Sequence, residues 1–282
     1  MASRIPPLLD PYLRLPPETS FILLSGVLGS TTNWLVLRYL HSLLSTATKE
    51  ESLDSSRVDG VSVIFASFLR DYAFWKENAG KLGLDLDGLS RKGRFVFVDG
   101  LINLFHESHG RIPGRSLGDH TGRKVLSSAT LQHFYTKMQD AATQIQRSAP
   151  EQKTVLLVDQ MDLLLAASGD DITSQGLRET LLGIREKVHL SVVTLSIDEP
   201  LVSSQTTPLE KEHAAFALSL AHDAQLVISL RMLDTGAARD VSGVLRVTPG
   251  GGRSSVDGAA VEDQELLYFV AADGGVRVFE RG

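Results

Sequence analysis

Short apolar segments alternate with amphipathic segments along most of the chain. The first apolar run, at residues 21–24, leads through a glycine-containing turn into a stretch whose leucines and Trp34 recur every three or four residues, as on one face of a helix. Five more apolar runs of strand length follow, at residues 61–66, 95–98, 154–158, 190–195 and 225–230. Helical patterns separate most of them, around residues 68–82, 125–147, 175–188 and 209–221. Strands that alternate with helices predict an α/β fold with a mostly parallel sheet flanked by helices.

The C-terminal part of the chain has a different pattern. Residues 241–247 and 266–270 are alternating or short apolar runs, and Asp273-Gly274-Gly275 is a turn signal before residues 276–279. This pattern predicts C-terminal antiparallel strands that end in a hairpin. We interpret residues 21–282 as a single domain, preceded by a Pro-rich N-terminal arm over residues 1–20.

Two segments are predicted to be loops. Glycine occurs at every fourth position from Gly110 to Gly122, and residues 106–124 have too few apolar side chains to pack. We interpret this stretch as a Gly-rich loop insertion. Residues 248–262 contain Pro249 followed by three glycines, which predicts a flexible loop.

Composition excludes several kinds of chemistry. The 282-residue chain contains no cysteine, which excludes disulfides, thiol catalysis and thiolate metal sites, and its eight histidines are scattered. We therefore expect no metal site and no cofactor. No apolar run has transmembrane length and the N-terminus lacks the apolar core of a secretion signal, so we expect no membrane association. We expect a cytoplasmic protein, with the nucleus as the alternative compartment.

The turn after the first apolar run has the context of a phosphate-binding loop but lacks its residues. Such a loop, G-x-x-x-x-G-K-[ST], wraps phosphates with backbone amides and supplies a lysine charge and a hydroxyl for magnesium. With Gly29 as the second glycine, Thr31 takes the magnesium position but Ser30 replaces lysine. With Gly26 as the first glycine, every later position fails, and the first lysine of the chain is Lys49. The sequence favours a structural strand-to-helix turn, a degenerate Walker A motif, over nucleotide binding.

A second motif ends at Asp159. Residues 154–158 are an apolar run, and the acid that follows is where a Walker B strand presents a carboxylate to magnesium. Apolar strands also end in aspartate simply because a loop begins there, so the match leaves both interpretations open. Without a lysine, Asp159 and Asp162 would face a triphosphate with like charge.

Basic residues near the glycine repeat are candidates for RNA contact. Arg111, Arg115, Arg123 and Lys124 lie in or beside it, and Asp119 is the only acid between the first and the last of them. Phosphate contacts need positive charge and reach but no reading of bases. A solvated loop with ordinary surface charges is the simpler interpretation. The net charge of −6 leaves room for a local basic patch of this kind.

Three further cations are weaker candidates, one for RNA contact and two for action on a neighbouring subunit. Lys211 is the candidate for RNA contact, because it is the only basic residue in the segment after the fifth apolar run. Arg231 and Arg239 follow the sixth run, where an arginine could reach into the site of a neighbouring subunit. Ion pairs with Asp234 or Asp240 explain the two arginines at least as well.

From residue 21 to its C-terminus the chain resembles the RecA-like P-loop NTPases. The segment KLGLDLD at residues 81–87 is similar to a segment of bacterial RecA, but Ser67 stands near the position of RecA's water-orienting glutamate. The chain is more similar still to the Elongator complex protein 6 family. The segments that carry this resemblance are residues 28–30, 81–83, 93–101, 156–159 and 239–247.

The resemblance implies a RecA-like fold and a pseudo-ATPase without catalytic residues. It also implies a heterohexameric accessory ring formed with two sister RecA-like Elongator subunits, which docks onto the catalytic Elongator lobes and binds tRNA in support of wobble-uridine modification. Two alternatives stay open. One is an active ATPase with an atypical P-loop that uses Thr31 and Asp159 on magnesium, and the other is a RecA-paralogue-like recombination mediator that binds single-stranded DNA.

Overall fold

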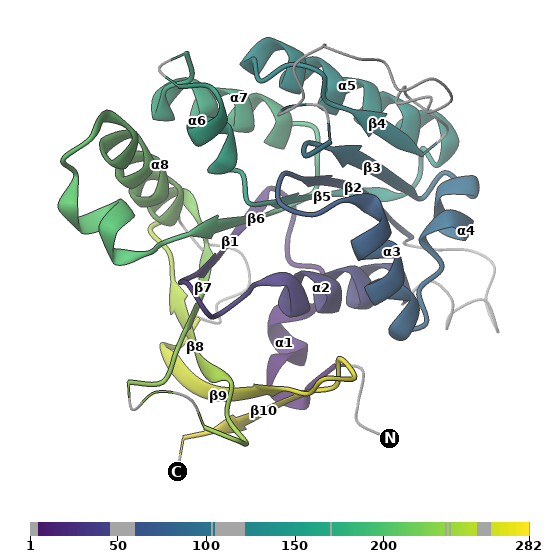
Figure 1. The fold of residues 1–282 in the computed structure, drawn as a ribbon. Coiled ribbons are helices and arrows are strands. Elements are labelled where there is room, and N and C mark those ends of the chain that lie inside the picture. The colour runs from purple at the N-terminus through teal and green to yellow at the C-terminus, as the bar shows by residue number, and fades with distance from the viewer. Residues whose placement is uncertain are drawn as a thin grey trace.

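The computed structural model of the chain describes residues 5–45, 60–102, 104, 122–169, 171–234, 236, 238–252 and 261–281. The strands within these ranges are β1 (Ser20–Gly26), β2 (Val61–Ser67), β3 (Phe95–Asp99), β4 (Arg123–Val125), β5 (Lys153–Asp159), β6 (Leu190–Ser196), β7 (Leu226–Arg231), β8 (Gly243–Pro249), β9 (Gln264–Val270) and β10 (Val276–Glu280). They form one sheet in the order β10-β9-β8-β7-β1-β6-β5-β2-β3-β4 (Figure 1). Strands β1 to β7 are parallel, and β8, β9 and β10 extend the sheet antiparallel. The predicted fold class and C-terminal hairpin are thus confirmed.

Helices cover both faces of this sheet. They are η1 (Pro7–Leu9), α1 (Asp10–Leu13), α2 (Asn33–Ser45), α3 (Tyr72–Lys81), α4 (Leu86–Arg91), α5 (Leu131–Ser148), α6 (Leu163–Ala167), α7 (Ser174–Arg185), the π-helix η3 (Pro200–Ser204) and α8 (Pro208–Asp223). Helices α1 to α4 lie on one face and α5 to α7 on the other, with α8 at their side (Figure 1). The two faces hold two separate clusters of buried apolar side chains.

The central strands explain why their sequences are continuously apolar. In β1, Ile22 and Leu24 belong to the cluster under α2, whereas Phe21 and Leu23 belong to the cluster on the opposite face. Successive side chains of a strand point to opposite faces, so a strand covered on both sides needs an apolar residue at every position.

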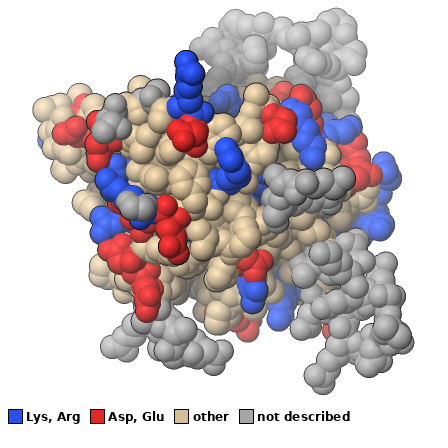
Figure 2. All heavy atoms as spheres, turned by 90° about the horizontal axis from the view of Figure 1, so that it is seen from below, with Lys and Arg blue, Asp and Glu red and all other residues tan. Residues whose placement is uncertain are grey.

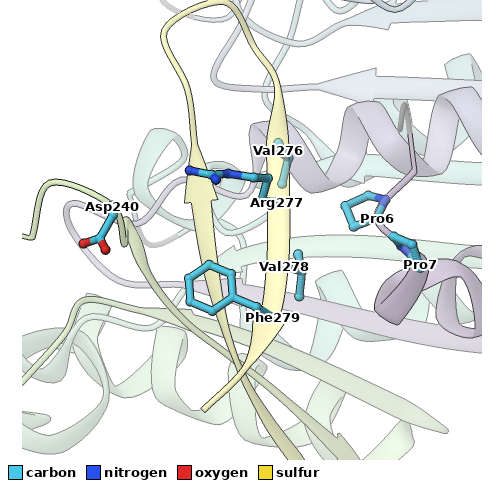
Figure 3. Close-up of a pocket in the computed structure, with 7 residues that line it drawn as sticks. All are labelled: Pro6, Pro7, Asp240, Val276, Arg277, Val278 and Phe279. Carbon is cyan, nitrogen blue, oxygen red and sulfur yellow. The ribbon is translucent and has the colours of Figure 1, made fainter. Parts of the chain in front are cut away.

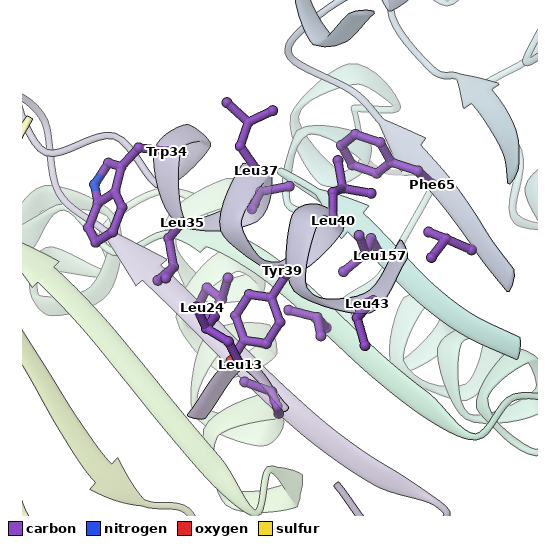
Figure 4. Close-up of a cluster of buried hydrophobic side chains, with 14 of the residues drawn as sticks. Leu13, Leu24, Trp34, Leu35, Leu37, Tyr39, Leu40, Leu43, Phe65 and Leu157 are labelled. Carbon is purple, nitrogen blue, oxygen red and sulfur yellow. The ribbon is translucent and has the colours of Figure 1, made fainter. Parts of the chain in front are cut away.

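Helix α2 is the most buried helix of its face. Its leucines and Tyr39 pack onto the sheet around Leu24, Phe65 and Leu157 (Figure 4). The next helix adds Trp75, which is fully buried and meets Phe65 edge to face at 4.8 Å between ring centroids. Aromatic rings in this geometry contribute beyond the area they bury.

Two helices begin later than their patterns predicted. Helix α3 begins at Tyr72, because the Asp71 side chain accepts a hydrogen bond from the amide of Phe74 at 2.9 Å. Helix α5 begins at Leu131, after the N-cap Thr130. The prediction that helix begins at residue 125 is therefore wrong. Residues Arg123–Val125 instead form β4, which pairs parallel with β3 at the edge of the sheet.

Part of the predicted N-terminal arm packs into the domain. Leu9 and Leu13 are fully buried in the cluster under α2, and the Tyr39 hydroxyl donates to the carbonyl oxygen of Tyr12 at 3.0 Å. These contacts make residues 7–13 part of the packed core.

Of the two predicted loops, residues 106–121 and 253–260 lie outside the described residues. The start of the second loop packs against the end of α8, since the amides of Gly250 and Gly252 donate to the carbonyl oxygens of Gln225 and Ala224 at 3.1 and 2.8 Å. None of the helices in the described part of the chain has the length and apolarity that crossing a bilayer requires.

The packing of the N-terminal segment can be tested by truncating Leu13. We expect Leu13→Ala to lower the free energy of unfolding by about 2–5 kcal/mol, since it removes a fully buried side chain and leaves a cavity. The matched control is Leu218→Ala on α8, where the side chain is 66% exposed and the change should be within about 0.5 kcal/mol. Chemical denaturation of the full chain measures both, and equal effects would show that residues 7–13 do not belong to the core.

Candidate functional site

The degenerate turn and Asp159 come together at one edge of the sheet. Gly26 ends β1 and Asp159 ends β5, with β6 between them. The register places Gly26 opposite Ser196 and Val158 opposite Val193. In open α/β sheets, ligands bind outside the carboxyl ends of the strands. This edge is therefore the candidate site, and the structure brings Gly26, Gly29, Ser30, Thr31 and Asp159 to it as the sequence predicted.

The turn itself is tightly closed. The Ser30 amide donates to the Val27 carbonyl oxygen at 2.9 Å, and Gly29 has a φ of +90°, which strongly favours glycine. Ser30, at the position of the missing lysine, is buried, and its hydroxyl donates to the Leu230 carbonyl oxygen of β7 at 2.9 Å. Residue 30 therefore fixes the turn against β7 and does not reach outward.

Asp198 occupies a backbone donor of the turn. Its carboxylate, which follows β6, accepts a hydrogen bond from the Leu28 amide at 2.6 Å. The Val27 amide donates to the Leu230 carbonyl oxygen at 3.3 Å. Together with the Ser30 amide, these donors are used within the chain, whereas a phosphate cradle needs them free and pointing at the anion. A bound phosphate would also meet the negative charge of Asp198.

Asp159 is fully buried and satisfied by its own chain. It accepts hydrogen bonds from the hydroxyls of Ser67 at 2.9 Å and Thr194 at 3.2 Å. Burial raises the pKa of Asp159 to about 6, and the two hydroxyl donors act in the opposite direction. In this geometry the carboxylate has no surface open to a magnesium ion from solvent.

Ser67 connects this carboxylate to α3. Its oxygen accepts hydrogen bonds from the indole Nε1 of Trp75 at 3.0 Å and from the Arg70 amide at 3.2 Å. Ser67 therefore organises the helix that follows β2 as well as Asp159. The sequence marked this position only by the absence of an acid, and the hydrogen-bonding role was not predicted.

Further buried polar groups continue along the edge of the sheet. Gln160 has a φ of +55°, its amide donates to the Thr194 hydroxyl at 2.8 Å, and its side chain accepts from the Ser196 hydroxyl at 2.8 Å. Asp162 lies 3.3 Å from Nε2 of His213, and both side chains are buried. We call the set Ser67, Asp159, Gln160, Asp162, Thr194, Ser196 and His213 the polar edge network. No group of three metal-ligating side chains occurs among residues of the described ranges.

The residues at this edge can be compared with those that bind a magnesium-bound triphosphate in a P-loop. Thr31 is exposed, but its hydroxyl oxygen accepts from the Asn33 amide at 3.2 Å. The lysine is absent, the amides of Val27, Leu28 and Ser30 donate within the chain, and Asp159 is internal. The residues present do not fit the group that a P-loop binds.

The predicted RNA-contact residues lie in different places. Arg123 and Lys124 are on β4, and the Arg123 guanidinium stacks 4.1 Å from the Tyr72 ring centroid. Lys211 is exposed on α8, on the other side of the molecule (Figure 1). Arg111 and Arg115 lie outside the described residues. On the face shown in Figure 2, the described lysines and arginines are interspersed with aspartates and glutamates.

Of the two candidate trans-acting arginines, Arg231 is paired within its own chain. Its guanidinium contacts Asp234 at 2.6 Å and Glu265 at 3.2 Å, and Glu265 also pairs with Arg281. This agrees with the ion-pair interpretation of Arg231. Arg239 is exposed in the segment between β7 and β8.

Two hollows lie on the side of the C-terminal strands, and the second of them adjoins the degenerate turn. One, of about 560 Å³, lies beside the edge strand β10. There Val276 and Val278 point toward Pro6 and Pro7, whereas Arg277 and Phe279 extend from the other side of the strand (Figure 3). The second is a groove of about 350 Å³ between α2, α3 and the β9–β10 turn.

Comparison with known proteins agrees with the architecture. The family model described as Elongation complex protein 6 matches residues 57–270. The chain is 24% identical to an Elongator complex protein 6 homolog of Schizosaccharomyces pombe, over 97% of this chain and 96% of that protein. It is also 24% identical to Elongator complex protein 6 of Xenopus laevis, over 92% and 96%. A KaiC-like protein of Pyrococcus horikoshii has a similar structure, with a TM-score of 0.57 and 13% identity over 99% of this chain and 98% of that one.

The burial of Asp159 predicts an unusual pH dependence of stability. Because burial raises the pKa of Asp159 from its ordinary value of 3.8 to about 6 in the folded chain, folding favours the protonated form. The resulting stabilisation is complete below the unfolded pKa and is lost as the pH rises through about 6. We expect the stability of the unsubstituted chain relative to Asp159→Asn to fall by roughly 2 kcal/mol between about pH 4 and pH 7.

Denaturation curves recorded across this pH range measure the effect. Asp263→Asn is a control of opposite sign, because the hydrogen bond from Arg246 lowers the pKa of Asp263 and its contribution is lost as the pH falls. Parallel pH profiles for the unsubstituted chain and Asp159→Asn would contradict the assigned burial of the carboxylate.

Proposed function

We propose that this chain, which belongs to the Elongation complex protein 6 family, is a non-catalytic RecA-like subunit of the Elongator complex. In this proposal it forms a heterohexameric ring with two sister RecA-like subunits, and the ring docks onto the catalytic Elongator lobes. The ring binds tRNA and supports modification of the wobble uridine, while another subunit performs the chemistry. A cytoplasmic location, with the nucleus as the alternative, belongs to the same proposal.

One observation carries the non-catalytic assignment. The Leu28 amide, which would belong to a phosphate cradle, is held by the chain's own Asp198. Phosphoryl transfer depends on positioned donors, a lysine and a magnesium ion held by carboxylate and hydroxyl groups. Here the amides of Val27, Leu28 and Ser30 donate within the chain, Ser30 replaces lysine and Asp159 has no exposed surface. These contacts support a subunit that contributes through its surfaces and not through phosphoryl transfer.

The tRNA contact is proposed for the basic segment that leads into β4. Lys124 lies on β4, which forms one edge of the sheet. Arg111 and Arg115 lie earlier in the same segment. Arg123 is the least available of the four candidates, because its guanidinium already covers the Tyr72 ring. Contacts of this kind bind phosphates and do not read bases.

The non-catalytic assignment predicts that restoring access to the turn does not create nucleotide binding. We expect neither the purified chain nor its Asp198→Ala variant to bind magnesium-ATP in calorimetry, because freeing one amide supplies neither the lysine nor an exposed magnesium ligand. In the assembled ring, Asp159→Asn should leave ATP hydrolysis unchanged. Turnover by the purified chain that disappears in Asp159→Ala would overturn the assignment.

The proposed RNA contact predicts a charge effect on binding. We expect the double variant Arg115→Glu, Lys124→Glu to weaken tRNA binding by the assembled ring about tenfold or more at moderate salt, and to reduce the salt slope by about two. Arg277→Glu is the matched control and should have little effect, since Arg277 is exposed on β10, at the opposite edge of the sheet from β4. Filter binding over a salt series measures both variants. Unchanged affinity in an intact ring would remove these residues from the contact.

Membership of the ring is tested by co-purification from the native organism. Recovery of the full chain with Elongator subunits is the expected result. Recovery with a recombinase in their place would contradict the proposal and favour the DNA-mediator alternative.

A further inference from the structure

The groove beside α2 contains a buried arginine without a carboxylate partner. Arg38 is only 3% exposed and its Nη2 donates to the carbonyl oxygen of Gly274 at 2.7 Å. Its Nε is buried and has no hydrogen-bond partner. No aspartate or glutamate of the described residues lies within ion-pair distance of it. Burial lowers the pKa of Arg38, and no neighbouring negative charge acts against this.

The acid next to Gly274 in the sequence does not neutralise Arg38. Asp273 precedes Gly274 in the β9–β10 turn, but it is exposed and accepts a hydrogen bond from the Gly275 amide at 2.8 Å. Arg231, in contrast, holds two carboxylates of its own chain. A buried charge is usually paired, because its desolvation is otherwise uncompensated. Arg38 therefore lacks the partner that its environment calls for.

A second donor in the groove is also unpartnered. The indole Nε1 of Trp34 is buried without a hydrogen-bond partner, and Trp34 is 5% exposed. Trp34 and Arg38 are four residues apart on α2, so they share one face of the helix. Both side chains line the groove, with the Tyr268 ring 5.1 Å from that of Trp34 and Phe74 on α3 completing the aromatic wall.

The buried guanidinium and the buried indole N–H indicate which chemical group the groove would bind. A cation and an indole N–H in an aromatic pocket are matched by a carboxylate, which accepts several hydrogen bonds at once. The volume of about 350 Å³ is near the lower limit of small-molecule sites and admits a side chain on a narrow stem. A nucleic-acid backbone is too broad to reach a guanidinium that is 3% exposed.

The surroundings favour a protein as the source of the carboxylate. Gly29 and Thr31 of the degenerate turn line the groove, and the adjacent Leu28 is 87% exposed. Arginine, tryptophan and tyrosine are the residues most enriched among the energetic centres of protein interfaces. An exposed large apolar side chain beside such a pocket is typical of a contact surface.

We propose that this groove receives an acidic side chain of a neighbouring protein subunit, whose carboxylate binds Arg38 and the indole N–H of Trp34. The identity of the neighbour as a sister RecA-like subunit rests on the proposed function above. The acidic side chain supplies the anion that Arg38 lacks, and the aromatic wall excludes water from the pair.

Fluorine NMR of the full chain tests the occupant directly. The chain has two tryptophans, and Trp75 is an internal control because its indole N–H already donates to Ser67. With 5-fluorotryptophan in this chain alone, we expect the Trp34 resonance to shift on assembly with unlabelled sister subunits while the Trp75 resonance stays in place. Addition of tRNA, or of inorganic phosphate, to the chain alone should move neither resonance. A Trp34 shift caused by either anion alone would overturn the proposal, as would an unmoved Trp34 in the assembled ring.

A substitution series tests the energetics of the same groove. We expect Arg38→Gln to weaken assembly at least tenfold, with partial recovery in Arg38→Lys, which keeps the charge but loses the planar fork. Trp34→Phe should weaken it several-fold, because it keeps the ring and removes only the N–H. Arg147→Gln, at an exposed position on α5, is the matched control and should have no effect. Thermal unfolding of each purified chain separates loss of folding from loss of binding.

The outcomes distinguish the two proposals. Normal assembly of folded Arg38→Gln and Trp34→Phe chains would overturn the groove proposal and leave the proposed function intact. Failure of the unsubstituted chain to assemble with the sister subunits would overturn the proposed function, and this occupant with it.

Discussion

The buried carboxylate of Asp159 sets the arrangement of the whole carboxyl edge of the sheet. A carboxylate in an apolar interior is costly unless it is protonated or hydrogen-bonded, and a buried acceptor left unsatisfied costs about 1–3 kcal/mol or more. Among the described residues, no lysine forms an ion pair with it and no group of metal ligands surrounds it. The chain meets this constraint with hydroxyls from the strands on both sides, Ser67 on β2 and Thr194 on β6. Each hydroxyl in turn holds another group, Trp75 or the backbone of Gln160.

The degenerate turn also satisfies its polar groups within the chain, and here the groups are backbone amides. Amides at the start of a helix and in the turn before it need acceptors, and in a functional P-loop the phosphates provide them. Here the acceptors are the carbonyl oxygens of Leu230 and Val27 and the carboxylate of Asp198. These three hydrogen bonds hold the strand-turn-helix geometry through contacts within the chain, where a functional P-loop would use phosphate.

The fold was largely predictable from the sequence, whereas the site was predictable only in part. The central strands are apolar at every position because both faces are covered, so their pattern identifies them directly. Strand β4 was missed because Arg123 and Lys124 do not have strand-like apolarity at an edge that is only partly covered. The missing lysine and Asp159 are local signals that sequence reveals. Asp198 and Thr194 were not predicted, because hydrogen bonds between residues far apart in sequence depend on which strands become neighbours.

Arg231 and Arg38 show most clearly that the sequence does not reveal contacts between residues far apart in the chain. Its position at the end of β7, the sixth strand predicted from the sequence, made Arg231 a candidate for action on a neighbouring subunit, yet Asp234 and Glu265 already neutralise it. Arg38 carried no signal in the sequence, since it occurs in the middle of an amphipathic helix where a cation is ordinary. Only the structure shows that it is buried with a single carbonyl partner. An arginine already neutralised in its own chain gains little from another anion. An arginine that is buried and unpaired has already lost its hydration on folding, so binding an anion does not require that desolvation again. The capacity to recognise a neighbour therefore follows from electrostatic balance within the folded chain and not from position relative to a motif.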